Sequence, residues 1–192
     1  MLDPYFSGTK IRWLLDEVSG ARQRAERGEL CFGTVDSWLL WRLTGGAVHA
    51  TDPSNASRTL CYDIRRRSWD EGLCEALGVP AALLPEVKPS AGLFGETAAG
   101  VLPAGIPVTG IAGDQQSALF GQCCFEPGMA KNTYGTGCFL LLNTGGKPVP
   151  ETFADFQTSV GRVSGALVYY LTGDSRVALN SGFSQRIPHF AG

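Results

Sequence analysis

The segment 110–137 most constrains how this chain folds, because it places an acidic residue at the junction of a strand and a helix. Residues 106–112 are apolar without a helical period and are bounded by Gly and Pro, which predicts a short buried strand. Residues 115–120 are typical of the opening of a helix, and Gly113 allows the sharp turn before it. Asp114 therefore lies just after a strand end, where α/β proteins bind their ligands.

Two interpretations of Asp114 follow from this position. In the first it caps the helix, because aspartate is a favoured residue at helix N-termini. In the second its carboxylate takes a proton from a substrate hydroxyl, or orders a metal ion that bridges phosphates. The local pattern leaves both open.

A Gly-Thr-Gly turn follows at Gly135, Thr136 and Gly137, and residues 131–134 and 138–142 predict paired strands on either side of it. Glycines at such a turn let backbone N–H groups approach an anion closely, and the threonine hydroxyl adds a donor. A Gly-x-Gly sequence in a hairpin is also typical of a plain turn. Taken alone, the motif favours a simple turn over an anion site.

Two amphipathic helices are predicted upstream. The first covers residues 8–19, where the apolar residues at helical spacing are Ile11, Leu14, Leu15 and Val18. The second begins near Val35 and is terminated by Gly45 and Gly46, and we expect its tryptophans, Trp38 and Trp41, to pack in the core. Residues 51–59 are rich in Asp, Asn, Ser and Thr, so we interpret them as a structural loop beside a substrate cleft, with side chains bonded to local backbone.

Composition fits a domain with a substantial core. Hydrophobic residues make up 44% of the chain, charged residues 18%, and the net charge of −2 shows no bias toward nucleic acid or anionic membranes. The six cysteines form no C-x-x-C pair and only two histidines are present, which argues against a zinc site and a disulfide framework. No apolar run approaches a membrane span and no signal peptide is visible, so we expect the cytoplasm.

Four ordered blocks resemble one family. The segment 110–137 is similar to the GDQQ-to-YGTG region of the glycerol kinases of the FGGY carbohydrate kinase family. Residues 4–17 (PYFSGTKIRWLLDE), 33–46 (GTVDSWLLWRLTGG) and 51–59 (TDPSNASRT) resemble further blocks of the same family. Together they span most of residues 3–150, which argues against chance similarity.

This resemblance implies a fold. Members of the family have two domains of the ribonuclease H-like α/β fold, as in actin and hexokinase, with the active site in the cleft between them. By that resemblance residues 1–122 are the later part of the first domain and residues 123–192 begin the second, with a boundary near Gly121–Gln122. The match is faint over 151–192, where residues 163–171 are the only candidate strand pair, and Met1–Asp3 looks like an internal start.

The resemblance also implies a reaction: transfer of a phosphoryl group from ATP, with Mg²⁺, to glycerol. Asp114 is then the general base, and Mg²⁺ bridges the ATP phosphates, with a place for the ion near Asp114 but no certain metal ligand. The implied site residues are Tyr5, Asp114 and Gln115 for glycerol, and Gly135, Thr136 and Gly137 for the nucleotide phosphates.

Alternatives remain. One alternative is that the chain is part of an FGGY kinase for another polyol or a pentulose, although the pair Gln115–Gln116 with the YGTGCF block favours glycerol. A noncatalytic truncated remnant is the third hypothesis, because the family's N-terminal phosphate-binding hairpin lies outside this chain. We therefore expect residues 1–192 alone to be inactive, and a homo-oligomer is a possibility for the full-length enzyme.

Overall fold

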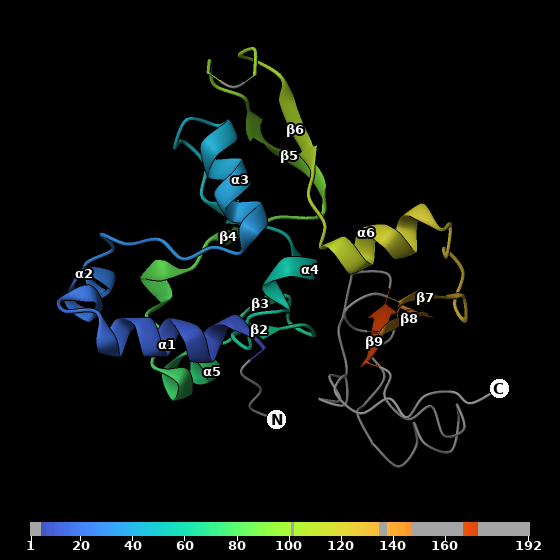
Figure 1. Ribbon diagram of the computed structural model, residues 1–192, viewed down its shortest axis with the longest axis horizontal. Coiled ribbons are helices and arrows are strands. Elements are labelled where there is room, and N and C mark those ends of the chain that lie inside the picture. Colours follow the sequence, from blue (N-terminus) through green and yellow to red (C-terminus); the bar gives the residue numbers. More distant parts are fainter. Residues whose placement is uncertain (1–4, 101, 135–137, 147–166, 173–192) are drawn as a thin grey trace. The chain divides into compact units, whose positions relative to one another are not determined.

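The computed structural model describes residues 5–100, 102–134, 138–146 and 167–172 (Figure 1). The chain divides into two compact units, Met1–Gly113 and Asp114–Gly192, which are described separately below. The domain boundary near Gly121–Gln122 stays a prediction.

The first unit contains short helices and short strands. Its helices are α1 (Ser7–Glu17), α2 (Ala21–Glu26), α3 (Val35–Leu43), α4 (Pro53–Ala56), α5 (Glu71–Leu77) and a 3₁₀ turn, η1 (Ala81–Leu83). Its strands are β1 (Ala50–Thr51), β2 (Tyr62–Asp63), β3 (Ser68–Trp69), β4 (Glu86–Val87), β5 (Ala91–Glu96) and β6 (Pro107–Gly110). Among the described residues β1 pairs with β4 in parallel, while β2–β3 and β5–β6 are antiparallel pairs.

The main core of this unit lies between α1, α2 and α5. Ile11 and Leu15 of α1 are buried there, and the Gly8 N–H donates to the carbonyl oxygen of Thr59 at 2.8 Å. A Cβ at Gly8 would lie 2.7 Å from that oxygen, so the close approach requires glycine. The helix predicted over residues 8–19 forms over Ser7–Glu17, but Leu14 within it and Val18 just after it are half exposed.

A second apolar cluster forms beneath α3. It consists of Leu40, Ala50 and Phe94, with Val48, Val108 and Ile111 packed against it. The helix ends as predicted, since Gly45 and Gly46 take the left-handed conformation with φ of 66° and 88°. The expected burial of Trp38 and Trp41 is wrong: they are 60% and 36% exposed, because only the Leu40 side of the helix meets the cluster.

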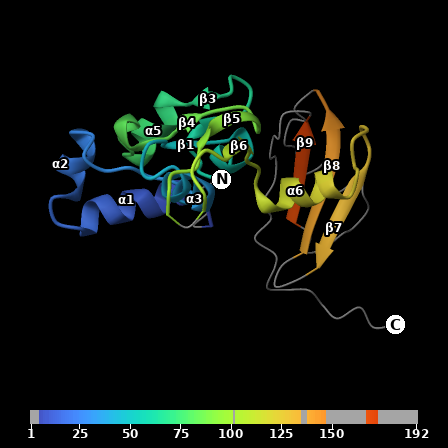
Figure 2. The same ribbon diagram turned by 90° about the horizontal axis from the view of Figure 1, so that it is seen from above.

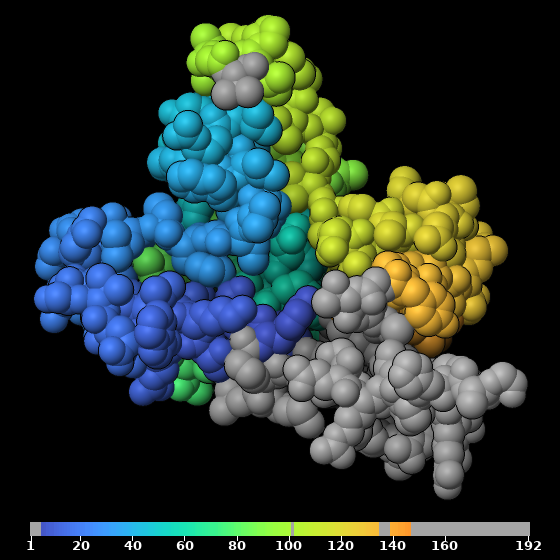
Figure 3. Space-filling view, viewed as in Figure 1, coloured from blue at the N-terminus to red at the C-terminus, as the bar shows by residue number. Residues whose placement is uncertain are grey.

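The strand predicted at 106–112 forms as β6, but it is not buried. Its residues are mostly exposed and Ile106 is 44% exposed. Among the described residues β6 pairs only with β5, so one of its edges and much of its surface face outward. Figure 3 shows this hairpin, in yellow-green, projecting beyond α3. The apolar run at 106–112 therefore predicted the strand correctly and its environment incorrectly.

The second unit packs one helix on a three-stranded sheet. Helix α6 (Asp114–Gly121) lies across the sheet of β7 (Ala130–Tyr134), β8 (Cys138–Gly145) and β9 (Leu167–Thr172), as Figure 2 shows. Strand β7 is antiparallel to β8, and β9 is parallel to β8. Leu119 of α6 meets the fully buried Leu141 of β8.

These elements confirm the predicted helix after Asp114 and the predicted strands flanking the Gly-Thr-Gly turn. Of the strand pair expected at 163–171, the structure describes β9, which pairs with β8, while residues 163–166 lie outside the described residues. The described residues form a mixture of helices and strands, which is consistent with the predicted α/β class. Within the described part of the chain, no helix is both long and apolar enough to cross a membrane.

Candidate active site

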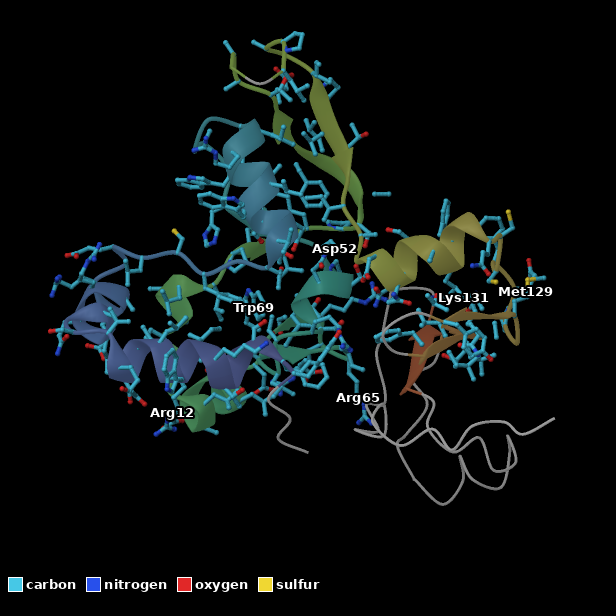
Figure 4. The ribbon with its side chains drawn as sticks, in the orientation of Figure 1. Arg12, Asp52, Arg65, Trp69, Met129 and Lys131 are labelled. Carbon is cyan, nitrogen blue, oxygen red and sulfur yellow. The ribbon has the colours of Figure 1, made fainter. Side chains whose placement is uncertain are left out.

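A fully buried carboxylate, Asp52, organises the loop that begins at β1. Its Oδ1 accepts hydrogen bonds from the backbone N–H and side-chain amide of Asn55, at 3.0 and 2.8 Å. Its Oδ2 accepts from the backbone N–H and hydroxyl of Ser54, at 3.1 and 2.7 Å, and from the hydroxyl of Ser90 at 2.6 Å. Figure 4 shows Asp52 at the start of α4. Five donors compensate for the loss of water around the carboxylate.

This cluster reaches the residue immediately before Asp114. The Ser54 hydroxyl donates to Asp52 and accepts a hydrogen bond from the Gly113 N–H at 2.6 Å. The predicted local bonds within residues 51–59 are confirmed. Their interpretation as purely local was incomplete, because Ser90 and Gly113 are distant in sequence and only the folded chain reveals them as partners.

Asp114 is the first residue of α6, and its side chain is exposed. The Nε2 group of Gln115 donates a hydrogen bond to Oδ2 of Asp114 at 3.3 Å. The N-terminal turn of a helix favours negative charge. An exposed carboxylate with one long hydrogen bond to its neighbour remains accessible to a substrate hydroxyl.

Lys131 is the residue near Asp114 that the sequence did not reveal. It lies in β7, is 2% exposed, and is labelled in Figure 4. Its Nζ donates hydrogen bonds to Oε1 of Gln115 and to Oγ1 of Thr133. Burial lowers the pKa of Lys131, and the negative charge of Asp114 opposes that effect. Strand alternation, which puts Lys131 and Thr133 on the same face, was the available signal.

The structure thus brings together Asp114, Gln115 and Lys131. Tyr5 belongs to the first unit, where the residue is 54% exposed and its ring centroid lies 5.1 Å from the guanidinium carbon of Arg58. Gly135, Thr136 and Gly137 lie outside the described residues. Within the described part of the chain, no group of three or more His, Cys, Asp or Glu side chains is placed to hold a metal ion.

The sequence pattern of the N-terminal domain of the FGGY family of carbohydrate kinases matches residues 1–121. The chain belongs to this family. This FGGY-family chain is 59% identical to a glycerol kinase of Carboxydothermus hydrogenoformans, in an alignment that covers 93% of this chain and 36% of that protein. It is 61% identical to a glycerol kinase of Halorhodospira halophila, over 90% of its length and 34% of that protein. The FGGY chain therefore spans about a third of these relatives.

Solved structures agree with this assignment. The FGGY chain superposes on a Plasmodium falciparum glycerol kinase crystallised with ADP with a TM-score of 0.72 and 43% identity, over 76% of this chain and 29% of that one. A xylulose kinase from Rhodospirillum rubrum gives a TM-score of 0.57 at 21% identity, over 69% of this chain and 27% of that one, which shows a shared fold alone.

Proposed function

We propose that this chain, as part of a longer enzyme, takes part in the ATP-dependent phosphorylation of glycerol to sn-glycerol 3-phosphate. The observation that carries the proposal is its 59% identity to a glycerol kinase over 93% of the chain. The grouping of Asp114, Gln115 and Lys131 supports it, because a carboxylate beside an amide donor suits a substrate hydroxyl.

The proposed enzyme has ribonuclease H-like domains of the actin and hexokinase type. Residues 1–122 form the later part of the first, substrate-side domain, and residues 123–192 begin the second, nucleotide-side domain. Similarity to FGGY kinase structures supports this arrangement. The cytoplasm, and homo-oligomers of the full-length enzyme, stay predictions.

In the proposed reaction Asp114 is the general base. A terminal glycerol hydroxyl attacks the γ-phosphorus of ATP, its O–H proton passes to the Asp114 carboxylate, and a new O–P bond forms. The bond from the γ-phosphorus to the β–γ bridging oxygen breaks, and that oxygen leaves with the electron pair as part of ADP. Because such transition states are loose, positioning supplies much of the rate.

The other residues bind and orient the substrates. Gln115 donates a hydrogen bond to a glycerol hydroxyl, and Tyr5 lines the glycerol pocket with an apolar ring and one hydroxyl. Gly135, Thr136 and Gly137 hold the nucleotide phosphates. Mg²⁺, when bound, neutralises phosphate charge, and we assign its ligands mainly to the ATP phosphates, since magnesium commonly keeps few protein ligands.

A substrate panel on the full-length enzyme tests the function. We expect phosphorylation of glycerol with ATP to exceed that of xylulose and of other polyols by a wide margin in kcat/KM. Preference for a pentulose would replace glycerol with the second candidate, another substrate of an FGGY kinase. Residues 1–192 assayed alone should transfer no phosphate, and activity there would contradict the proposed division of the site.

A further inference from the structure

Lys131 carries a positive charge in an interior position of the second unit. It lies on β7 opposite the fully buried Leu141 of β8, the residue that packs against Leu119 of α6. Lysine is almost never buried without partners, because desolvation of an ammonium group is costly. A lysine retained among apolar side chains therefore requires a compensating polar arrangement.

The polar groups around Lys131 fix the orientation of the Gln115 side-chain amide. An ammonium group has only donors, so it must face the carbonyl oxygen of the Gln115 amide. The amide NH₂ group is then turned the other way, and its Nε2 donates to Oδ2 of Asp114 at 3.3 Å. The Thr133 hydroxyl accepts a second hydrogen bond from Lys131 and fixes the ammonium from the strand side.

We propose that Lys131 is a positioning residue, whose ammonium locks the Gln115 amide with its NH₂ group toward Asp114 and the substrate hydroxyl. The inference rests on the proposed function. Gln115 can then only donate to the hydroxyl oxygen, so the hydroxyl proton is left to point at a carboxylate oxygen of Asp114. Lys131 in this way fixes the direction in which the hydroxyl proton leaves.

The test is a double-mutant cycle in the full-length enzyme, with Lys131→Met, Gln115→Ala and the two combined. Misplacement of a substrate-binding group by about 1 Å can cost about 10²-fold in rate, so we expect Lys131→Met to lower kcat/KM for glycerol by roughly that factor. Because Lys131 acts through Gln115, the double variant should be no worse than Gln115→Ala alone. Lys88→Met, which removes a partly buried lysine paired with Glu86, is the matched control and should keep wild-type kinetics.

A second variant tests the orientation itself. Gln115→Glu keeps an acceptor for the Lys131 ammonium, so the fold is retained, but it removes the donor that faces Asp114. We expect it to lose as much kcat/KM as Gln115→Ala, with an unchanged melting temperature. Near-wild-type activity of Gln115→Glu or of Lys131→Met would overturn the inference, as would losses that multiply in the double variant. Failure of the wild-type enzyme to phosphorylate glycerol would instead refute the proposed function.

Discussion

Asp52 and Asp114 are the same residue type at the start of a helix, yet their surroundings are opposite. Asp52 is fully buried and accepts hydrogen bonds from five donors. Asp114 is exposed and accepts one long hydrogen bond from its neighbour. A carboxylate whose acceptor positions are filled holds the backbone in place. One with open positions beside an oriented amide is able to receive a proton.

The largest expected effect on stability comes from removing the saturated carboxylate. Asp52→Ala in the full-length enzyme leaves several buried donors without an acceptor. Each such donor costs about 1–3 kcal/mol, so the total loss should exceed that from losing any single donor. Unfolding in urea followed by tryptophan fluorescence measures the change. The matched variant Asp114→Ala should move the midpoint little, since exposed sites usually contribute within about 0.5 kcal/mol. Equal destabilisation by Asp52→Ala and Asp114→Ala would contradict the difference in role between the two carboxylates.

A smaller effect is expected at Ser54, whose hydroxyl bonds both Asp52 and the backbone N–H of Gly113, the residue before Asp114. Ser54→Ala removes the acceptor of the Gly113 N–H and one donor of Asp52, at a cost of about 1–3 kcal/mol. It should also lower kcat several-fold, because the residue before Asp114 loses its anchor.

Ser57→Ala is the control for that variant. The Ser57 hydroxyl donates to the Ser54 carbonyl oxygen at 2.8 Å, whereas the Gly113 N–H donates to the Ser54 hydroxyl. Its removal should leave kcat unchanged. A loss of kcat with Ser57→Ala equal to that with Ser54→Ala would indicate a general loosening of α4 and not a specific anchor.

The smallest effect concerns a third carboxylate, that of Asp63, which accepts three hydrogen bonds and whose side chain is 19% exposed. The side chain of Arg66, together with the backbone N–H groups of Arg66 and Arg65, holds the pKa of Asp63 at about 2, below its ordinary 3.8. Its stabilising contribution is therefore complete above about pH 3.8 and is lost as the pH falls toward about 2. Arg66→Gln should raise the pKa of Asp63 toward 3.8 in an NMR titration; a pKa still near 2 would assign the shift to the backbone alone.

Local pattern predicted much of this structure. The spacing of apolar residues predicted α1 and α3, and the glycines at the strand-to-helix turn predicted α6. The Gly-Thr-Gly turn predicted the β7–β8 pair. Burial was predicted less well: Trp38 and Ile106 are apolar but exposed, because exposure depends on which elements pack against a face and not on the residue itself.

The candidate site shows the same division. Asp114 and Gln115 were identifiable because they are adjacent in sequence at a strand-to-helix junction. Lys131 is separated from Gln115 by the rest of α6 and a loop, and Gly113 is distant in sequence from Ser54. Such partners are set by packing of α6 on the sheet and by the path of the chain around Asp52, neither of which leaves a mark in the local sequence.

Kinetics of Asp114→Asn in the full-length enzyme test the central claim most directly. The amide keeps the size of the side chain but cannot take the hydroxyl proton, and general-base catalysis typically contributes about 10²–10⁴-fold. We expect single-turnover phosphorylation at saturating glycerol and ATP to slow by at least about 10²-fold, with glycerol affinity and melting temperature near wild type. A wild-type single-turnover rate would contradict the assignment of Asp114 as the base.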